Sequence, residues 1–280
     1  MNKYTLINGD RMKLLGKLKD NSVQLIITSP PYNIGKSYEK KMPLQEYIIE
    51  QRRTLFECSR VLKKKGSLCW QVGNYTNGKS EIIPLDILIF NICNKMGLKL
   101  RNRIIWHYEH GLHHQNRFSG RYETIMWFSK SNEYIFNLDK VRVPQKYPGK
   151  LSYKGKNKGK YSGNIKGKNP SDVWIIPNVK SNHREKTIHP CQFPIEIAER
   201  LILALSKKND LVIDPYMGTG TTLCAAIKNH RRTAGSEIKK KYINVAKKRI
   251  MLLKNGKLPI RETFSPIQVA RPNSKLYKRN

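Results

Sequence analysis

A short run of polar and turn-forming residues directly follows an apolar segment near the N-terminus. Here Ser29 is followed by Pro30, Pro31 and Tyr32. The two prolines remove two backbone donors and stiffen the turn, so that carbonyl oxygens can project into a cleft beside the Ser29 hydroxyl. We expect this cleft to accept hydrogen bonds from an amino group, and Tyr32 to offer a face on which a heterocycle taken out of a duplex can stack. The alternative is that the prolines only end a strand.

A second candidate site lies far along the chain, in a glycine-containing turn. A strand ends in Asp214, a turn with Gly218 and Gly220 leads into a helix, and Glu237 ends the next strand about twenty residues later. Glu237 is placed to accept hydrogen bonds from ribose hydroxyls. Leu223 stands where the NAD fingerprint has its third glycine, which favours an adenosine-bearing cofactor without a pyrophosphate. The alternative is an ordinary strand-to-helix turn.

The elements that must position these two segments alternate along the chain. Strands are predicted at Tyr4–Ile7, Val23–Thr28, Ser67–Val72, Arg103–His107, Leu211–Asp214 and Thr233–Ser236. Helices are predicted from the Gly9-Asp10 loop through Leu18, over Leu44–Leu62, over Pro84–Met96, from Pro194 through Leu205, from the end of the Gly218–Gly220 loop through Ile227, and along Tyr242–Leu253. This alternation predicts an α/β fold with a mostly parallel sheet and helices on both faces.

Two local predictions are specific enough to be tested. The helix at 44–62 is expected to stop at Leu62, because the cations Lys63–Lys65 and then Gly66 follow it. Tyr122–Phe128 and Tyr134–Phe136 resemble an antiparallel hairpin at the edge of the sheet.

The charge of the chain indicates a polyanionic partner. Its 280 residues carry 54 Lys and Arg against 20 Asp and Glu, a formal net charge of +34, which favours nucleic acid. A membrane surface is the weaker alternative, since there is neither an apolar run long enough to span nor a basic-then-apolar leader. We therefore expect a cytoplasmic protein, associated with the nucleoid through DNA binding.

Cysteines and histidines predict no metal site. The five cysteines show no metal-binding spacing and are interpreted as buried thiols. His107, His110, His113 and His114 are clustered, but no cysteine or carboxylate completes a ligand set, so a loop that touches a polar partner is the preferred interpretation.

The composition changes abruptly between Val143 and Asp172. Lysines alternate with Gly, Asn, Ser and three tyrosines, and no apolar periodicity is present. Such a segment cannot form its own core. Aromatic residues among cations can stack on bases while the lysines neutralise phosphates, which favours DNA contact over a plain linker.

The two candidate sites together resemble the S-adenosylmethionine-dependent DNA amino-methyltransferases, and the resemblance covers most of the chain. The family's (D/N/S)PP(Y/F) motif corresponds to residues 29–32, and its cofactor loop to residues 214–220. Gly9-Asp10, Arg117–Thr124 and His189–Pro194 match further family segments, although the last departs from the commoner HPTQKP form. The catalytic motif precedes the cofactor motif, which is similar to the permuted β-type order. The resemblance implies a Rossmann-like class I methyltransferase fold with an antiparallel edge hairpin and an inserted recognition region.

The resemblance also implies roles for individual residues. Asp10 would contact the adenine of S-adenosylmethionine, Glu237 its ribose, and the 218–221 and 189–194 segments its methionine part. The candidate cofactor residues are Asp10, His189, Phe193, Asp214, Gly218, Thr219, Gly220, Thr221 and Glu237. The target amino group is assigned to Ser29, Pro30, Pro31 and Tyr32. The candidate DNA-binding residues are Arg117, Arg121, Lys150, Lys154, Lys156, Lys158 and Lys160.

In the expected mechanism, the target NH₂ donates to Ser29 and to the Pro30 carbonyl, which aims the nitrogen lone pair at the sulfonium methyl. The transfer needs neither a covalent enzyme intermediate nor a strong general base. Ser at position 29 is usual among cytosine-N4 enzymes of this family, so cytosine-N4 is favoured over adenine-N6. An RNA amino-methyltransferase and a non-catalytic nucleic-acid-binding protein remain alternatives from other classes.

The expected organisation follows the motif order. Residues 1–140 would form the catalytic half of the methyltransferase domain, 141–186 a basic target-recognition region, 187–256 the cofactor-binding half, and 257–280 a loosely attached basic C-terminal tail. Double-stranded DNA is the expected partner. A cognate restriction endonuclease, and the choice between monomer and homodimer, stay open.

Overall fold

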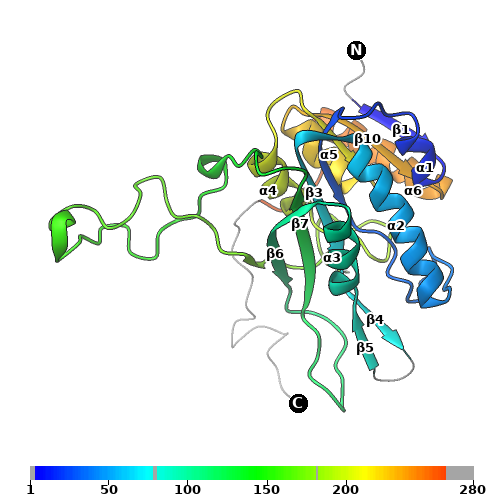
Figure 1. Cartoon of the computed structure of the whole chain (residues 1–280), viewed down its shortest axis with the longest axis horizontal. Coiled ribbons are helices and arrows are strands. Elements are labelled where there is room, and N and C mark those ends of the chain that lie inside the picture. The colour runs from blue at the N-terminus through cyan, green and yellow to red at the C-terminus, as the bar shows by residue number, and fades with distance from the viewer. Residues whose placement is uncertain (1–3, 78–80, 181, 263–280) are drawn as a thin grey trace.

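A single mixed sheet forms the centre of the molecule. The computed structural model describes residues 4–77, 81–180 and 182–262 (Figure 1), and in this part of the chain the main sheet has eight strands. In spatial order they are β1 (Tyr4–Asn8), β10 (Arg232–Glu237), β9 (Leu211–Asp214), β2 (Val23–Thr28), β3 (Leu62–Val72), β7 (Tyr122–Ser129), β6 (Lys99–His107) and β8 (Val173–Ile175).

The strand directions bring distant loops to one edge of this sheet. β1, β10, β9, β2 and β3 run parallel to one another, β7 is antiparallel to its neighbours β3 and β6, and β8 is parallel to β6. The carboxyl ends of the parallel strands therefore share an edge with the beginning of β7. β9 and β2 are adjacent although they are far apart in sequence, and such a reversal of strand order is where α/β sheets place their ligand sites.

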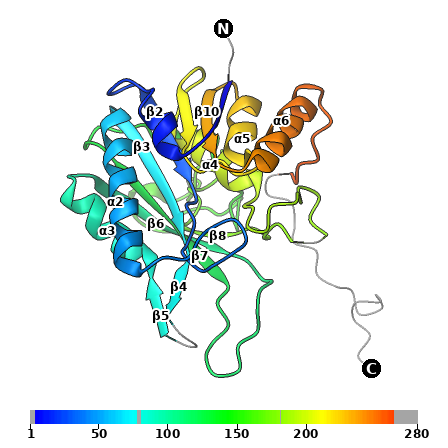
Figure 2. The same ribbon diagram turned by 90° about the vertical axis from the view of Figure 1, so that its right-hand side faces the viewer.

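Helices cover both faces of the sheet, as Figure 2 shows, with α2 and α3 on one side and α5 and α6 on the other. The helices are α1 (Arg11–Leu15), α2 (Leu44–Val61), α3 (Leu85–Lys95), α4 (Ile195–Leu205), α5 (Thr221–Lys228) and α6 (Lys240–Lys254). Two 3₁₀ turns, at Leu138–Lys140 and Gly155–Asn157, and a small hairpin of β4 (Asn74–Asn77) and β5 (Glu81–Pro84) complete the elements of the described residues.

The alternation of side chains along the central strands divides the core into two layers. Leu25 and Ile27 of β2 pack with residues of α4, α5 and α6, whereas Ile26 between them packs with residues of α1, α2 and α3. All six residues of β2 are buried, as expected for a parallel strand covered on both faces. Each such apolar side chain contributes about 1.5–3 kcal/mol of burial free energy, so the strands that end at the candidate site are firmly anchored.

The predicted fold class is confirmed, but the predicted partner of the strand at 122–128 in the edge hairpin was wrong. Tyr134–Phe136 is not a strand, and the antiparallel hairpin is made by β6 and β7. Tyr134 and Phe136 instead pack their rings on Trp127, with ring centroids 5.5 and 5.6 Å apart. Burial of aromatic surface, rather than ladder hydrogen bonds, explains the apolar pattern of this segment. The pairing of β8 with β6 was not predicted.

The helix predicted over 44–62 ends within one residue of its predicted end, but the reason for its end differs from the prediction. α2 ends at Val61, and β3 begins at once with Leu62, which is paired with Val23. The register then shifts, because Leu25 is paired with Ser67, so extra residues of β3 bulge out at this point. Gly66 serves this bulge, since an added Cβ there would lie 2.9 Å from the Lys63 carbonyl oxygen. Strand pairing has overridden the local helix-stop signal.

The chain beyond Gly256 is attached more firmly than expected as far as residue 262. Leu258 and Ile260 pack against the core beside α4. The Arg261 backbone N–H donates to Glu185 Oε1 at 3.0 Å, and its guanidinium pairs with Glu196 at 2.9 Å. The prediction of loose attachment is therefore wrong for residues 257–262, and residues 263–280 lie outside the described part. No helix among the described residues has the length and apolarity needed to cross a membrane.

Candidate functional site

Both predicted loops line one cavity at the carboxyl edge of the sheet. The cavity has a volume of about 600 Å³, and its wall includes residues 29–34 after β2 and residues 215–219 after β9. The strands before these loops are joined by a hydrogen bond of 2.6 Å from Thr28 Oγ1 to Asp214 Oδ1. The expectation that the loops around Pro30 and Gly218, remote in sequence, lie side by side at the carboxyl edge of one sheet is borne out by this geometry.

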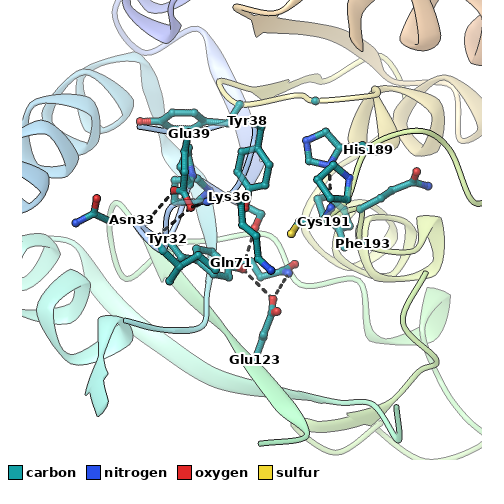
Figure 3. A pocket seen from close by; sticks show the side chains of 18 of the residues that line it. Tyr32, Asn33, Lys36, Tyr38, Glu39, Gln71, Glu123, His189, Cys191 and Phe193 are labelled. Atoms are coloured by element: carbon teal, nitrogen blue, oxygen red, sulfur yellow. Dashed lines mark hydrogen bonds between the residues drawn. The ribbon is translucent and has the colours of Figure 1, made fainter. Parts of the chain in front are cut away.

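A chain of hydrogen bonds organises the side of the cavity next to Ser29. Ser29 Oγ and Tyr32 Oη lie 2.9 Å apart, and Tyr32 donates to Glu123 Oε2 at 2.8 Å (Figure 3). Gln71 Nε2 donates to the same carboxylate oxygen at 2.8 Å. Gln71 comes from the end of β3 and Glu123 from the beginning of β7, so two strands and the loop after β2 supply this cluster.

Burial controls the titration of this cluster. Desolvation raises the pKa of Glu123, which the hydrogen bonds from Tyr32 and Gln71 only partly oppose. The pKa of Tyr32 lies well above its ordinary value, first because the phenol is buried and second because the Glu123 charge faces it. Tyr32 is therefore a neutral hydrogen-bond donor at physiological pH.

The backbone after Ser29 is held in a defined shape. Tyr47 of α2 donates its hydroxyl to the Pro31 carbonyl at 3.0 Å, whereas no donor among the described residues takes the Pro30 carbonyl. Glu39 accepts from the backbone N–H of Asn33 at 2.8 Å and that of Ile34 at 3.0 Å. Glu39 thus fixes the start of the loop 33–42, which lines the cavity, and the Pro30 carbonyl remains available as an acceptor.

The glycine turn after β9 forms the opposite wall. Gly218 and Gly220 have φ of +50° and +78°, in the left-handed region that favours glycine. An added Cβ at Gly220 would lie 3.0 Å from the Cβ of Ala246 on α6. The turn therefore brings the backbone close to both α6 and the cavity before α5 begins at Thr221.

Carboxylates follow the neighbouring strands at the same edge. Glu237 ends β10 and lines the cavity, with Oε1 accepting from the Lys239 N–H at 2.8 Å, and burial raises its pKa. Asp10 follows β1, lines the cavity, and caps α1 by accepting from the Met12 N–H at 2.8 Å. Two acidic groups beside a glycine turn are the hydrogen-bond acceptors that the hydroxyl and amino donors of an adenosine moiety require, so the residues present fit such a cofactor.

His189 lines the cavity directly beside Gly218, where an added Cβ would lie 3.6 Å from His189 Nε2. Its ring lies 4.5 Å from that of Tyr242 and 5.1 Å from that of Tyr38, between centroids. Burial lowers the pKa of His189 to about 4, and its Nδ1 accepts from the Cys191 N–H at 3.1 Å. The imidazole is thus neutral, with Nε2 carrying the hydrogen.

Not every predicted cofactor residue lines the cavity. Thr219, Thr221 and Phe193 line the cavity, whereas Gly220, in the same turn, does not. Asp214 lies beneath the cavity, 1% exposed, where it accepts from Thr28, Thr222 and the Tyr216 N–H at 2.6, 2.7 and 3.1 Å. Asp214 therefore connects the two loops through hydrogen bonds beneath the cavity and does not line the cavity itself.

The predicted DNA-binding residues fall into two groups, both outside the cavity lining. Arg117 and Arg121 lie in the β6–β7 loop, where Arg121 donates to the carbonyls of Leu112 and Gly120, both at 2.9 Å. The five lysines between 150 and 160 are exposed on an arm that extends far from the body of the molecule (Figure 1). Within the described residues, no group of His, Cys, Asp and Glu is arranged to hold a metal ion.

Sequence reasoning missed Glu123 and Gln71 as site residues. Glu123 lies within the segment 117–124 that was recognised as similar to a family segment, but nothing in its local sequence marks it. Its place follows from the register, in which Gln71 is paired with Ile125, two residues after Glu123 on the same strand face. An acidic residue at the start of an antiparallel strand beside the site strands is the signal that could have found it.

Comparison with known proteins defines the class. Residues 23–248 match the DNA methylase family N6_N4_Mtase, and the chain belongs to this family. It is an S-adenosylmethionine-dependent DNA amino-methyltransferase, as the site geometry indicates.

Particular relatives agree with this class. The chain is 49% identical over 241 residues to the type II methyltransferase M.BglII of Bacillus subtilis, over 86% of this chain and 67% of that protein. It is 32% identical over 254 residues to the DNA adenine methyltransferase YhdJ of Escherichia coli K12, over 88% of this chain and 82% of that protein. The structure of TTHA0409 from Thermus thermophilus, complexed with S-adenosyl-L-methionine, matches with a TM-score of 0.64 and 26% identity, over 90% of this chain and 97% of the other.

Proposed function

We propose that this chain methylates the N4 amino group of a cytosine that is flipped out of duplex DNA. The observation that carries the proposal is the shared cavity, which is lined both by Ser29 and Pro30 and by the turn at Gly218 and the carboxylate Glu237. A base inside a duplex cannot reach such a recessed site, and chemistry on it requires extrusion.

The residues of the chain hold and orient the target. The amino group donates one hydrogen bond to Ser29 Oγ and one to the Pro30 carbonyl, which directs the nitrogen lone pair across the cavity. Tyr32 supports the base through its ring, which is held in place by its hydroxyl and by Gly73, where an added Cβ would lie 3.1 Å from Tyr32 Cε2. Bound S-adenosylmethionine supplies an activated methyl group, and Asp10, Glu237 and the Gly218 turn would hold it. Positioning accounts for most of the rate in such a site.

The choice of base is supported by the residue at position 29. A serine hydroxyl accepts a hydrogen bond without adding a negative charge beside the target, as the cytosine-N4 members that this motif resembles do. Adenine-N6 is the alternative, since YhdJ is named as an adenine methyltransferase.

Digestion of methylated DNA to nucleosides followed by mass spectrometry decides between the two bases. We expect N4-methylcytosine. Detection of N6-methyladenine alone would show that the target base is adenine and contradict the choice of cytosine. An RNA substrate is tested in parallel by labelled methyl transfer to duplex DNA and to RNA. Transfer to RNA alone, or to neither, would contradict the proposal.

The surfaces outside the cavity are proposed to hold the duplex. The exposed lysines of the arm, at positions 150–160, and the arginines of the β6–β7 loop supply the cations that phosphates require. A restriction endonuclease of the same specificity is a proposed partner, supported by the type II name of M.BglII. Size-exclusion chromatography with light scattering distinguishes monomer from homodimer.

A further inference from the structure

A continuous path of hydrogen bonds leads from the target position to the half-buried carboxylate of Glu123. Ser29 Oγ is 2.9 Å from Tyr32 Oη, which is 2.8 Å from Glu123 Oε2. The expected mechanism assigned no acceptor for the proton that a methylated amino group must lose. This path bears directly on that step, and the inference rests on the proposed function.

The direction of each hydrogen bond in the path follows from counting hydrogens. An ionised carboxylate has no hydrogen to donate, and a phenol has only one. Because Tyr32 uses its hydrogen on Glu123, the bond between Ser29 and Tyr32 must be donated by Ser29. The lone pairs of Ser29 Oγ that remain point away from its own hydrogen and are free to accept from the target amino group. Glu123 thus sets the polarity of a hydroxyl that it does not touch.

The surroundings of Glu123 make it a group that can take up a proton. Gln71 of β3 is its second hydrogen-bond donor, and Lys180, after β8, is the cation that faces it. Tyr32, Tyr38 and Tyr108 are the titratable groups that sense its charge from the loops after β2 and β6. Burial raises the carboxyl pKa, which favours the protonated form once a proton arrives.

We propose that the proton leaving the target nitrogen passes through the Ser29 and Tyr32 hydroxyls to the Glu123 carboxylate. The N–H bond breaks and its electron pair stays on nitrogen, while a new O–H bond forms at Ser29. The original Ser29 hydrogen moves to Tyr32, and the original Tyr32 hydrogen moves to Glu123 Oε2. Both hydroxyls are restored, the carboxylate becomes a neutral carboxylic acid, and solvent later removes the proton. Glu123 acts here through Tyr32 and Ser29, without contact with the base.

The test is the pH dependence of a single turnover, measured with tritiated S-adenosylmethionine and unmethylated plasmid DNA. For the unaltered protein we expect the rate to rise with pH as Glu123 ionises and then to level off. Glu123→Gln keeps the shape of the side chain but cannot accept the proton. It should lower the plateau rate by about 100-fold or more and flatten the profile, while the Kd values for S-adenosylmethionine and DNA stay within about twofold. Glu123→Asp should restore part of the rate and of the pH dependence.

A second variant and a matched control keep the outcome decisive. Tyr32→Phe breaks the path without altering Glu123, and should flatten the profile in the same way. Glu133→Gln removes a carboxylate at an exposed site paired with Lys65, and should leave rate and profile unchanged. A normal pH-dependent rate in either Glu123→Gln or Tyr32→Phe would overturn the proposal. Absence of methyl transfer by the unaltered protein would instead contradict the proposed function, so the two failures are distinguishable.

Discussion

Thr28 and Asp214 are joined by a buried hydrogen bond of 2.6 Å between the last residues of two strands that lie far apart in sequence. Asp214 also accepts from Thr222, the second residue of α5, at 2.7 Å. One carboxylate therefore ties the strand that leads to the amino pocket, the strand that leads to the glycine turn, and the helix after that turn. The relative position of the two halves of the site depends on this side chain.

The Asp214 tie predicts an unusual dependence of stability on pH. Burial raises the pKa of Asp214 to about 6, above its ordinary value of 3.8. Because the folded-state pKa is the higher one, the contribution to stability is fully present below about pH 4 and is lost as pH rises through about 6. The difference amounts to about 3 kcal/mol at most.

Asp214→Asn removes this titration. We expect the free energy of unfolding of the unaltered protein, relative to that of the variant, to decline between pH 4 and pH 7 in urea titrations. A difference that stays constant over this range would contradict the assignment. Asp214→Ala, which removes the acceptor for both hydroxyls and the Tyr216 N–H, should cost about 2–4 kcal/mol near pH 4, and this cost should decline toward pH 7 because alanine does not titrate.

Gly220 is predicted to be intolerant of any side chain for two additive reasons. Its φ of +78° is strained for other residues, and an added Cβ would lie 3.0 Å from the Cβ of Ala246. Gly220→Ala should lower the free energy of unfolding by about 2–3 kcal/mol. Gly256→Ala is the matched control, because Gly256 has a φ of +67° and open space around its Cβ position. The control should cost about 1–2 kcal/mol, and equal losses would show that close packing at Gly220 contributes nothing.

Tyr32→Ala is expected to separate catalysis from cofactor binding. The substitution removes both the ring that supports the base and the hydroxyl that holds Ser29 and Glu123 together. Turnover should fall by about 100-fold or more, since one positioning contact and one hydrogen-bonded path are lost. The Kd for S-adenosylmethionine, measured by isothermal titration calorimetry, should change by less than about twofold. An equal loss of cofactor affinity would contradict this assignment and show that Tyr32 contributes to cofactor binding.

The arm lysines are predicted to contribute through phosphate contacts. Replacing Lys154, Lys156 and Lys158 together by Gln should weaken duplex binding and reduce the slope of log K against log salt concentration by about 3. The Kd for S-adenosylmethionine should not change, because none of these three lysines lines the cavity. Lys247→Gln with Lys248→Gln, two exposed positions on α6, is the control for general loss of charge. An equal effect in the control would show that the arm has no special role.

Much of the fold could be predicted because its signals are local. β2 at Val23–Thr28 and β9 at Leu211–Asp214 have the predicted bounds, since short apolar runs closed by turn residues leave few alternatives. The helix predicted over 44–62 ends within one residue of its expected end, but the pairing of Leu62 with Val23 ends it, and not the predicted cap signal at Lys63–Gly66. The segment 134–136 failed because aromatic burial on Trp127 produces the same apolar pattern as a strand.

The site could be predicted only where its residues lie in contiguous motifs. Ser29 and Gly218 each belong to a turn whose chemistry can be read from adjacent residues. Glu123 has no such context, and its role arises from the antiparallel register that brings β7 beside β3. Asp214 is the opposite case, a residue that the motif predicts to contact the cofactor. The strand order instead places Asp214 beneath the cavity, between β9 and β2.

The sequence by itself determined the two loops, their turn geometry, the fold class and the excess of positive charge, because each depends on neighbouring residues or on composition. Only the tertiary structure decided that Thr28 meets Asp214, that Tyr32 donates to Glu123, and that Ser29 is therefore left as an acceptor. The physical reason is that hydrogen bonds form between groups within about 3 Å in space, and strand order and register, which no single segment encodes, decide which groups come that close.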